Sequence, residues 1–372
     1  MKKIAIVILN WNGQQLMEQF LPSVLAHSPA ELAEVVVADN GSTDGSIAML
    51  QAKFPMVRRI VFEKNWGFAE GYNKALEQIE SPYTVLLNSD VEVTAGWLDA
   101  PLAAMEQDEQ LAAVQPKIRA YRDKRYFEYA GAAGGFMDSY GYPFCRGRVL
   151  HIVEEDRGQY DQPTDILWAT GACLFIRTQL YRHVGGLDAG FFAHQEEIDL
   201  CWRLRSRGYR LRCCPESVVY HVGGATLHVE SPRKTFLNFR NNLLMLYKNL
   251  PENRLQPVMR VRFWLDYLAA LKFLLCGHPQ NAWAVYEARS AYQALKVQYA
   301  PKRQENLRLT RVKEIPEILS KSLIKEFYLH GKRYFPALMK GKYPFFLNNP
   351  KIFGKIFALT RFFSTFANKE RN

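Results

Sequence analysis

The sequence predicts an α/β protein with a mostly parallel sheet flanked by helices, followed by a helical and basic C-terminal extension. Short β-branched runs alternate with segments of helical spacing in the first third of the chain, which is typical of a parallel sheet with both faces covered. The composition changes near residue 235, after which Lys and Arg dominate. A length of 372 residues accommodates a large domain and an extension.

Four apolar runs predict the first strands, at residues 4–9, 35–38, 60–62 and 83–87. The segments LMEQFLPSVLAH and FAEGYNKALEQI have helical spacing and separate these strands. The opening run IAIVIL resembles the start of a signal peptide, but it is short and no small-residue cleavage site follows it. We therefore expect it to be a buried first strand.

Polar residues follow each of these four strands. The clusters are Asn10, Asp39-Asn40-Gly41, Asn65-Trp66-Gly67 and Asn88-Ser89-Asp90. Ligands of open α/β sheets bind at the carboxyl ends of the strands, so we expect the four clusters to line one crevice.

The crevice lacks the glycine-rich loops that bind phosphates. Neither G-x-G-x-x-G nor G-x-x-x-x-G-K-[ST] follows the first strand, where Asn10-Trp11-Asn12-Gly13 stands instead. A metal bound by Asp90, with the side-chain oxygen of Asn88 as a weaker neighbour, would hold a diphosphate in another way. Oxygen ligands favour Mg²⁺ or Mn²⁺. Taken alone, Asn88-Ser89-Asp90 is more typical of a simple turn, but its position behind a buried strand and level with Asp39 favours the metal site.

Beyond residue 160 the pattern is mixed. LWATGACLFIR, GYRLRCC and ESVVYHVGG predict strands, and EEIDLCWRLRSRG predicts a helix between them. This helix begins with Glu196, Glu197 and Asp199, flanked by the apolar residues Phe191, Phe192, Ile198 and Trp202. A carboxylate in an apolar crevice suits a general base, although acids at a helix start can also simply cap it.

Seven motifs occur in order: VILNWNG, VVVADNGSTDGS, NWGFAEGYNKAL, LLNSD, WATGACLFIR, FFAHQEEIDLCWRLRSRGY and VVYHVGG. Over roughly residues 3–225 the chain thereby resembles family 2 glycosyltransferases of the GT-A fold, particularly their bacterial rhamnosyltransferase-like branch. The resemblance implies a catalytic domain over residues 1–235, with a nucleotide-sugar half of about 1–115 and an acceptor half of about 116–235. Residues 236–372 then form the helical, basic region.

The resemblance also implies roles for the crevice residues. Asp39 would contact the nucleotide base, and Asn10, Trp11, Asn65 and Asn88 would line the donor pocket. Asp90 matches the final acid of the family's D-x-D-like metal motif, in which Asn88 replaces the first acid. His221 matches a further metal ligand, whereas a histidine after a strand is otherwise more often structural.

By the same resemblance Glu197 is the general base, with Glu196 as the alternative, because most members have Asp at the second position. The helix dipole is expected to keep both acids ionised. Asp199 is expected to pair with Arg203 one turn later. Gly171 and Ala172 would let the acceptor approach the backbone. Trp168 would stack on a sugar face or lie in the core.

The expected reaction is inverting transfer of a sugar from a nucleoside-diphosphate sugar, with dTDP-rhamnose as one candidate, to a polysaccharide or lipid-linked glycan. Glycoside hydrolysis is disfavoured because it needs a second acid across the scissile bond. A catalytically inactive sugar-binding or scaffold protein is the alternative, since Asn88 and Glu197 both depart from the family pattern.

The C-terminal region is expected to bind an anionic membrane surface. Residues 231–372 contain 26 Lys and Arg against 8 Asp and Glu, a net charge of +18. Residues 263–276 form an apolar run interrupted by Asp266 and Lys272, too short to span a bilayer and suited to its interface. Residues 340–366 mix Lys and Arg with many Phe.

This predicts a cytoplasmic protein, peripheral on the inner face of the cell membrane, and six cysteines without CxxC spacing fit a reduced compartment. Packing of the tail on the catalytic domain is the alternative. No nucleic-acid partner is expected, because no recognisable binding motif is present.

Overall fold

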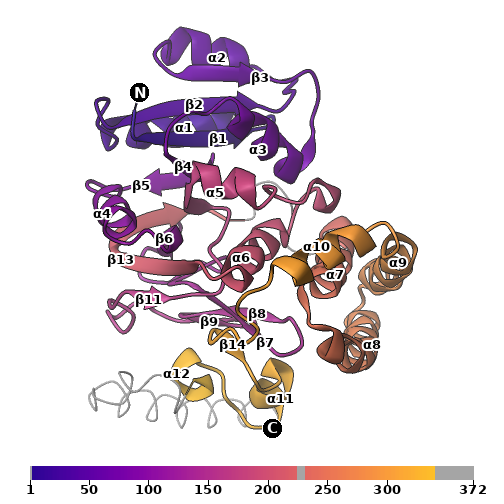
Figure 1. Ribbon diagram of the computed structural model, residues 1–372. Helices are drawn as coiled ribbons and strands as arrows, with labels where there is room; N and C mark the ends of the chain where they lie inside the picture. The colour runs from indigo at the N-terminus through magenta and orange to yellow at the C-terminus, as the bar shows by residue number, and fades with distance from the viewer. Residues whose placement is uncertain (1, 224–230, 340–372) are drawn as a thin grey trace, which may run out of the picture.

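The computed structural model describes residues 2–223 and 231–339. Over these residues a nine-stranded mixed sheet lies next to a second sheet of five short strands (Figure 1). The strand order along the large sheet is β11-β13-β6-β12-β4-β1-β2-β3, with β5 paired to β13. The predicted α/β architecture with a helical C-terminal region is confirmed.

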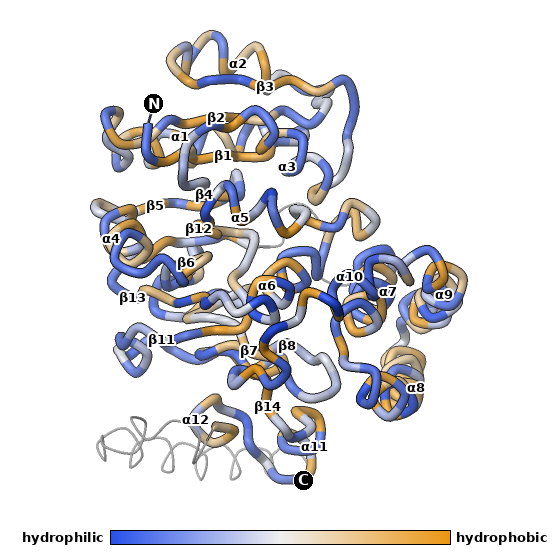
Figure 2. The backbone as a smooth tube through the Cα atoms, in the orientation of Figure 1, coloured by the Kyte–Doolittle hydropathy of each residue, from blue (hydrophilic) through white to orange (hydrophobic). Residues whose placement is uncertain are grey.

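The four predicted N-terminal strands form and run parallel. They are β1 (Ile4–Asn10), β2 (Ala33–Asp39), β3 (Arg58–Val61) and β4 (Tyr83–Asn88). Hydrophobic residues dominate β1 and β2 (Figure 2). Side chains alternate across β1, so Ile4, Ile6 and Ile8 join one core cluster while Ala5 and Val7 join the other. Both faces are therefore buried, as the continuous apolar runs predicted.

Helices cover this half of the sheet. They are α1 (Gln14–Ala26), α2 (Ser46–Lys53) and α3 (Gly67–Glu77), whereas α4 (Asp99–Gln107) packs against strands of the other half. Of these, α1 and α3 coincide with the two segments of helical spacing.

The other half of the large sheet contains β5 (Val91–Val93), β6 (Leu111–Ala120), β11 (Thr164–Asp165), β12 (Cys173–Arg177) and β13 (Arg210–His221). The strand predicted over LWATGACLFIR is shorter than expected, because the chain turns where the Cys173 amide donates to the Thr170 carbonyl. The two strands predicted in 208–224 merge into β13, with a register shift between Cys214 and Val218.

The second sheet was not predicted. Its strands are β7 (Gly135–Asp138), β8 (Pro143–Cys145), β9 (Arg148–Val149), β10 (Ile152–Val153) and β14 (Ile318–Leu319). The short helices α11 (Leu323–Tyr328) and α12 (Phe335–Leu338) follow β14 and lie below this sheet (Figure 1). Strands of two to four residues are too short to show a hydrophobic period.

The remaining helices follow β12, and most of them gather at one side of the sheets (Figure 1). They are α5 (Thr178–His183), the short 3₁₀ helix η1 (Ala189–Phe191), α6 (Glu196–Ser206), α7 (Pro232–Asn249), α8 (Glu252–Leu275), α9 (Pro279–Leu295) and α10 (Ala300–Leu309). Helix α7 contacts α6, α9 and α10, and α8 packs on α9. The predicted division between residues 235 and 236 falls inside α7.

Within residues 2–223 and 231–339, no helix has the length and hydropathy needed to cross a bilayer. The basic, Phe-rich stretch 340–366 lies outside the described residues.

Candidate active site

Asn10 and Asp39 end neighbouring strands and lie side by side. The two residues are register partners in β1 and β2, and the Asn10 side-chain amide donates to Asp39 Oδ2 at 3.0 Å. The Ser42 backbone amide donates to Asp39 Oδ1 at 2.9 Å. Asp39 is 1% exposed, so a nucleotide base would reach it through its remaining lone pairs. Trp11, by contrast, is 48% exposed and open to a ligand.

Asn65 lies at the same edge of the sheet. Its side-chain oxygen accepts from the Gly67 amide at 2.7 Å and from the Asn40 side-chain amide at 3.1 Å. Asn40 also accepts from the Trp66 backbone amide at 3.0 Å. These bonds fix the start of α3 against the end of β2, so the second and third polar clusters meet as expected.

Asp90 and His221, the two residues predicted to bind a metal, lie next to each other. His221 Nε2 lies 3.1 Å from Asp90 Oδ1, and the Asn88 side-chain nitrogen lies 3.4 Å from His221 Nε2. Both Asp90 and His221 are 6% exposed. A second acid, Glu128, was missed in the sequence; its Oε1 lies 3.5 Å from the other ring nitrogen of His221.

These residues fit a divalent cation. Two ligand atoms about 3 Å apart match neighbouring positions around an octahedral Mg²⁺ or Mn²⁺, which keeps few protein ligands and takes diphosphate oxygens and water for the rest. Glu128 would orient His221, as carboxylates behind metal-binding imidazoles commonly do. Among the described residues, no three His, Cys, Asp or Glu side chains converge as a complete metal-binding group. The set therefore suits a metal shared with a substrate.

The metal pair has an anionic environment. Burial opposes protonation of His221, but hydrogen bonds to Asp90 and Glu128 outweigh it and raise the pKa of His221 to about 10. Burial likewise opposes ionisation of Asp90, and the hydrogen bond from His221 outweighs it, which lowers the pKa of Asp90. A pKa of about 10 means that the His221 ring is protonated at neutral pH in this structure, so a cation bound at Nε2 would have to displace that proton.

Glu197 faces the backbone of the predicted acceptor segment. Its carboxylate accepts from the amide of Gly171 and from the first amides of α6. The carbonyl of Ala172, next to Gly171, accepts from the Asn88 amide at 3.0 Å. The candidate base and the metal pair are thus linked through residues 171–172 and Asn88. In the described structure the Glu197 Oε2 atom is buried without a hydrogen-bond partner.

The two acids at the start of α6 differ in environment. Burial raises the pKa of Glu197 to about 7, although backbone amides oppose the shift. Burial, together with the charge of Glu197, raises the pKa of Glu196 well above its usual range. The expectation that the helix dipole keeps both acids ionised is therefore wrong for Glu196. Burial outweighs the dipole, and Glu197 is left as the acid that ionises near neutral pH.

Trp168 lies in the core rather than on the crevice surface. It is 3% exposed, its indole nitrogen donates to the Phe136 carbonyl at 2.8 Å, and its ring covers Gly135. Of the two roles left open for this residue, the structure supports core packing, because a sugar has no access to the indole faces. The Gly171 amide contacts Glu197, and Ala172 follows Gly171 in the chain. Acceptor binding by these two residues stays a prediction.

The loop of residues 190–195, which precedes Glu196, has an unusual backbone. Phe192, His194 and Gln195 have φ values of 66°, 70° and 73°, in the left-handed region that side chains other than glycine disfavour. The α3 amides of Phe68 and Ala69 donate to the Phe192 carbonyl at 2.8 and 3.1 Å.

Helix α7 supplies the other bonds to this loop. Asn241, which is fully buried, donates through its side-chain amide to the carbonyls of Phe191, Ala193 and His194 at 2.9, 2.9 and 2.8 Å. Asn242 donates to the Gln195 side chain at 3.1 Å. Sequence reasoning missed both residues, although two adjacent asparagines inside a helix are an unusual choice that could have drawn attention.

His194 was also missed. Burial, and to a lesser extent the charge of Lys234, lowers the pKa of His194 to about 4, so its ring is neutral at neutral pH. In the described part of the chain its Nε2 atom is buried and lacks a hydrogen-bond partner. A neutral imidazole two residues before Glu196 can hydrogen-bond a substrate hydroxyl.

Asp199 has the structural role expected of it. Arg203 Nε lies 2.9 Å from Asp199 Oδ2, which confirms the predicted pair one turn apart. Lys248 and Asn249 of α7 contact the same fully buried carboxylate at 2.7 and 2.8 Å. Helix α6, which carries Glu197, is thereby fixed to α7 by a buried ion-pair network.

The chain is similar to known glycosyltransferases. The family model "Glycosyl transferase family 2" matches residues 5–185. The N-acetylglucosaminyl-diphospho-decaprenol L-rhamnosyltransferase of Mycobacterium tuberculosis is 25% identical over 234 residues, which cover 59% of this chain and 75% of that protein. The low-salt glycan biosynthesis hexosyltransferase Agl10 of Haloferax volcanii is 22% identical over 247 residues, covering 65% of this chain and 74% of Agl10.

Solved structures share the fold at low identity. S. aureus TarS 1-349, whose complex with UDP is also known, aligns with a TM-score of 0.51 at 18% identity over 90% of this chain and 93% of that one. GalNAc-T7 with UDP, GalNAc and Mn²⁺ aligns with a TM-score of 0.53 at 14% identity over 81% of this chain and 57% of that one. The family model assigns residues 5–185 to glycosyltransferase family 2, and the solved structures share the GT-A fold of this chain.

Proposed function

We propose that this protein is an inverting, metal-assisted hexosyltransferase that extends a lipid-linked glycan or polysaccharide. The observation that carries the proposal is the position of the Glu197 carboxylate. Glu197 is partly buried, its pKa is about 7, and its Oε2 atom is buried without a partner in the described structure. Its carboxylate is linked through Gly171, Ala172 and Asn88 to the Asp90–His221 pair.

Glu197 acts as the general base in this proposal. The attacking acceptor hydroxyl gives its proton to Glu197 as its oxygen bonds to the anomeric carbon, while the bond from that carbon to the donor diphosphate breaks. A base whose pKa lies near the working pH is ionised in a large fraction of the molecules and still accepts a proton readily. Glu196 stays protonated and serves as a neutral neighbour. Attack from the face opposite the leaving group inverts the anomeric centre and needs no second carboxylate as nucleophile.

The donor occupies the crevice at the ends of β1, β2 and β4. Trp11, Asp39 and Asn10 lie at the nucleotide end, and Asn65 and Asn88 line the pocket. Asp90 and His221 would hold Mg²⁺ or Mn²⁺ against the diphosphate. When bound, the cation neutralises charge that develops on the leaving diphosphate. Asn88 replaces a carboxylate ligand, so we expect weaker metal affinity than two acids would give.

The acceptor and donor assignments draw on the relatives. The mycobacterial relative is named as a rhamnosyltransferase that acts on a sugar diphosphate linked to decaprenol. We accordingly propose dTDP-rhamnose as the first donor to test, and a sugar carried on a lipid diphosphate as the first acceptor. The alternative is a catalytically inactive sugar-binding or scaffold protein. Such a protein would retain the crevice but would not transfer a sugar.

Helix α8 has an exposed apolar face, and this face supports the proposal that the acceptor is linked to a lipid. In α8, Trp264, Leu268, Leu271 and Leu275 are 73%, 59%, 49% and 80% exposed, and their spacing puts them on one face, which we call the α8 apolar strip. The opposite face buries charge, since Arg262 and Asp266 form an ion pair at 3.0 Å that Arg289 of α9 joins. Asp266, which interrupts the apolar run in the sequence, is thus neutralised inside the protein.

Exposed apolar strips of this kind mark interaction surfaces. Arg260 and Lys272 are exposed and flank the strip on the same helix, which suits an anionic bilayer surface. We propose that the protein is cytoplasmic and binds the inner face of the cell membrane through α8.

The proposed reaction is tested by measuring binding and turnover of a panel of nucleotide sugars, with and without Mn²⁺ or Mg²⁺, in the presence of a lipid-diphosphate-linked acceptor. We expect one donor to bind in a metal-dependent way and to give a product of inverted anomeric configuration by NMR. A retained configuration would exclude the proposed mechanism. Metal-dependent binding without any turnover would favour the scaffold function.

A further inference from the structure

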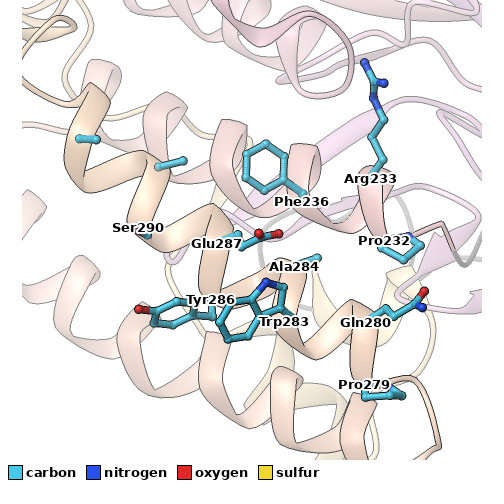
Figure 3. Close-up of a pocket in the computed structure, with 12 residues that line it drawn as sticks. Pro232, Arg233, Phe236, Pro279, Gln280, Trp283, Ala284, Tyr286, Glu287 and Ser290 are labelled. Carbon is cyan, nitrogen blue, oxygen red and sulfur yellow. The ribbon is translucent and has the colours of Figure 1, made fainter.

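A groove runs between α7 and α9, on the side of α7 away from its contacts with α6. It has a volume of about 1140 Å³ and is lined by Pro232, Arg233, Phe236, Pro279, Gln280, Trp283, Ala284, Tyr286, Glu287, Ser290, Ala291 and Ala294 (Figure 3). Its lining spans α9 from Pro279 to Ala294, roughly 22 Å at 1.5 Å per residue. An elongated groove of this length suits a chain-like ligand better than a compact one.

The lining is apolar at the base and polar at the edge. Phe236 of α7 points toward α9 between the helices, and Ala284 forms part of the base (Figure 3). Trp283 and Tyr286 are 60% and 49% exposed, with ring centroids 5.0 Å apart. The polar side chains Gln280, Glu287 and Ser290 belong to exposed residues, where water still solvates them. Such a surface buries hydrocarbon without burying an unpaired charge.

One end of the groove leads to the catalytic residues. Arg233 extends away from the groove (Figure 3), and its guanidinium lies 5.2 Å from the centroid of the Phe192 ring, in the 190–195 loop. Among the described residues, the contact made by this guanidinium is with an aromatic ring rather than with a carboxylate. It is exposed and remains available to an anion. A ligand leaving the groove at Arg233 therefore arrives beside the loop that precedes Glu196 and Glu197.

The face of α9 that lines the groove differs from the face that packs on α8. Helix α9 packs on α8 through a small cluster that includes Ala270, Ala282 and Val285. Trp283 follows Ala282 in α9 and Tyr286 follows Val285, and both aromatic side chains are exposed. The groove therefore opens on a different face of the helical region from the α8 apolar strip, which lies opposite the Asp266–Arg289 ion pair.

We infer that the α7–α9 groove binds the lipid chain of a lipid-diphosphate-linked acceptor, with Arg233 contacting the diphosphate. The inference rests on the proposed transferase function and adds the site that would recognise the acceptor's lipid. Apolar side chains contact the hydrocarbon, the cation meets the diphosphate, and the sugar beyond it reaches Glu197. An acceptor without lipid would lack these contacts and bind more weakly, with its chemistry unchanged.

The test compares two acceptors that carry the same sugar, one on a long isoprenoid diphosphate in detergent micelles and one on a short soluble aglycone. The variants are Trp283→Ser with Tyr286→Ser, which removes the exposed aromatics, and Ala291→Trp, which obstructs the groove. Met56→Ser is the control, because it removes an exposed apolar side chain that lies outside the groove and outside the α8 apolar strip.

We expect both groove changes to raise KM for the long-chain acceptor at least 10-fold, with KM for the soluble acceptor and for the donor unchanged. The control should leave both acceptors unaffected in micelles. Equal changes for both acceptors would overturn the inference and assign the groove to the sugar. No change for either acceptor would also overturn it.

A second readout does not depend on turnover. An isoprenoid diphosphate bearing a photoreactive group should crosslink to α7 and α9, and Ala291→Trp should abolish that crosslinking. Crosslinks elsewhere would refute the lipid site even if the enzyme is active. Crosslinking in the groove without transfer from any nucleotide sugar would leave the site standing and contradict the proposed reaction instead.

Discussion

The side-chain amide of Asn241 donates to the backbone carbonyl of His194 at 2.8 Å, so a helix of the C-terminal region determines the shape of the loop before the candidate base. The same amide also bonds the carbonyls of Phe191 and Ala193. Because three residues of this loop have left-handed backbones, it needs such external partners to keep its conformation.

Replacing Asn241 by Leu should displace the 190–195 loop. The carbonyl oxygens of Ala193 and His194 would lose this donor, whereas that of Phe191 keeps its bond from Arg240. Each unpaired oxygen would cost about 1–3 kcal/mol if it stayed buried, so the loop is expected to relax and move Glu197. We expect kcat to fall at least 10-fold with little change in the KM for the donor, whose pocket lies at other strands. Steady-state kinetics with a thermal melt would check this. Asn238→Ala, which removes a weaker 3.3 Å contact to Gln195, should have a much smaller effect on kcat.

The rate should depend on the ionisation of Glu197. A general base acts in its ionised form, and burial raises the pKa of Glu197 to about 7, so kcat/KM should increase with pH up to about 7 and then level. A profile that stays flat from pH 5 to 8 would contradict this assignment.

The raised pKa of Glu197 also predicts how the stability of the folded protein changes with pH. The folded state holds the Glu197 proton more tightly than the unfolded state, whose pKa is near 4.5. The contribution of Glu197 is therefore favourable below pH 4.5 and is lost as pH rises toward 7. Denaturant titrations should show wild type losing stability over this window relative to Glu197→Gln. Parallel curves would argue against a raised pKa.

Metal affinity should depend on both Asp90 and Glu128. Asp90→Ala removes a direct ligand and should abolish metal-dependent donor binding. Glu128→Gln leaves the ligands in place but weakens the orientation of His221, and loss of such partners typically costs about 10–100-fold in affinity. Mn²⁺ titration followed by electron paramagnetic resonance would measure both. Unchanged affinity in Glu128→Gln would show that the 3.5 Å contact to His221 has no role in metal binding.

Membrane binding should depend on the α8 apolar strip. Trp264→Asp with Leu271→Asp in the full chain places two charges on the exposed face and should reduce recovery with anionic liposomes several-fold. Met56→Asp is a suitable control, since Met56 is 72% exposed and lies far from α8 in the sequence. Equal recovery of wild type, the double variant and Met56→Asp would show that α8 does not bind the membrane. Equal recovery of wild type with neutral and with anionic liposomes would show that charge has no role.

Much of the catalytic half of the fold was predictable because buried parallel strands have a clear composition. The runs at β1, β2 and β4 are continuous and β-branched, and polar residues stop each one at the crevice. The five-stranded second sheet was not predictable, since strands such as β9 and β10 have two residues each. Pairing of that kind depends on contacts distant in sequence rather than on a local period.

The site was predictable only in part. Asp90, His221 and Glu197 follow recognisable strand ends or a helix start, so motif order could suggest them. Glu128 and Asn241 act through partners far away in the chain, and nothing in their local sequence specifies those partners. The raised pKa of Glu196 arises from burial, which depends on the packed structure rather than on the acidic motif.

The most direct test of the account compares Glu197→Gln with Glu196→Gln for donor binding and for sugar transfer. Glu197→Gln should bind the donor as wild type does and lose about 10²–10⁴-fold in kcat, because only the base is removed. Glu196→Gln should lose less than about 10-fold, because Glu196 is already neutral in the folded protein. If Glu196→Gln is the inactive variant and Glu197→Gln transfers sugar normally, the assignment of the base to Glu197 is contradicted.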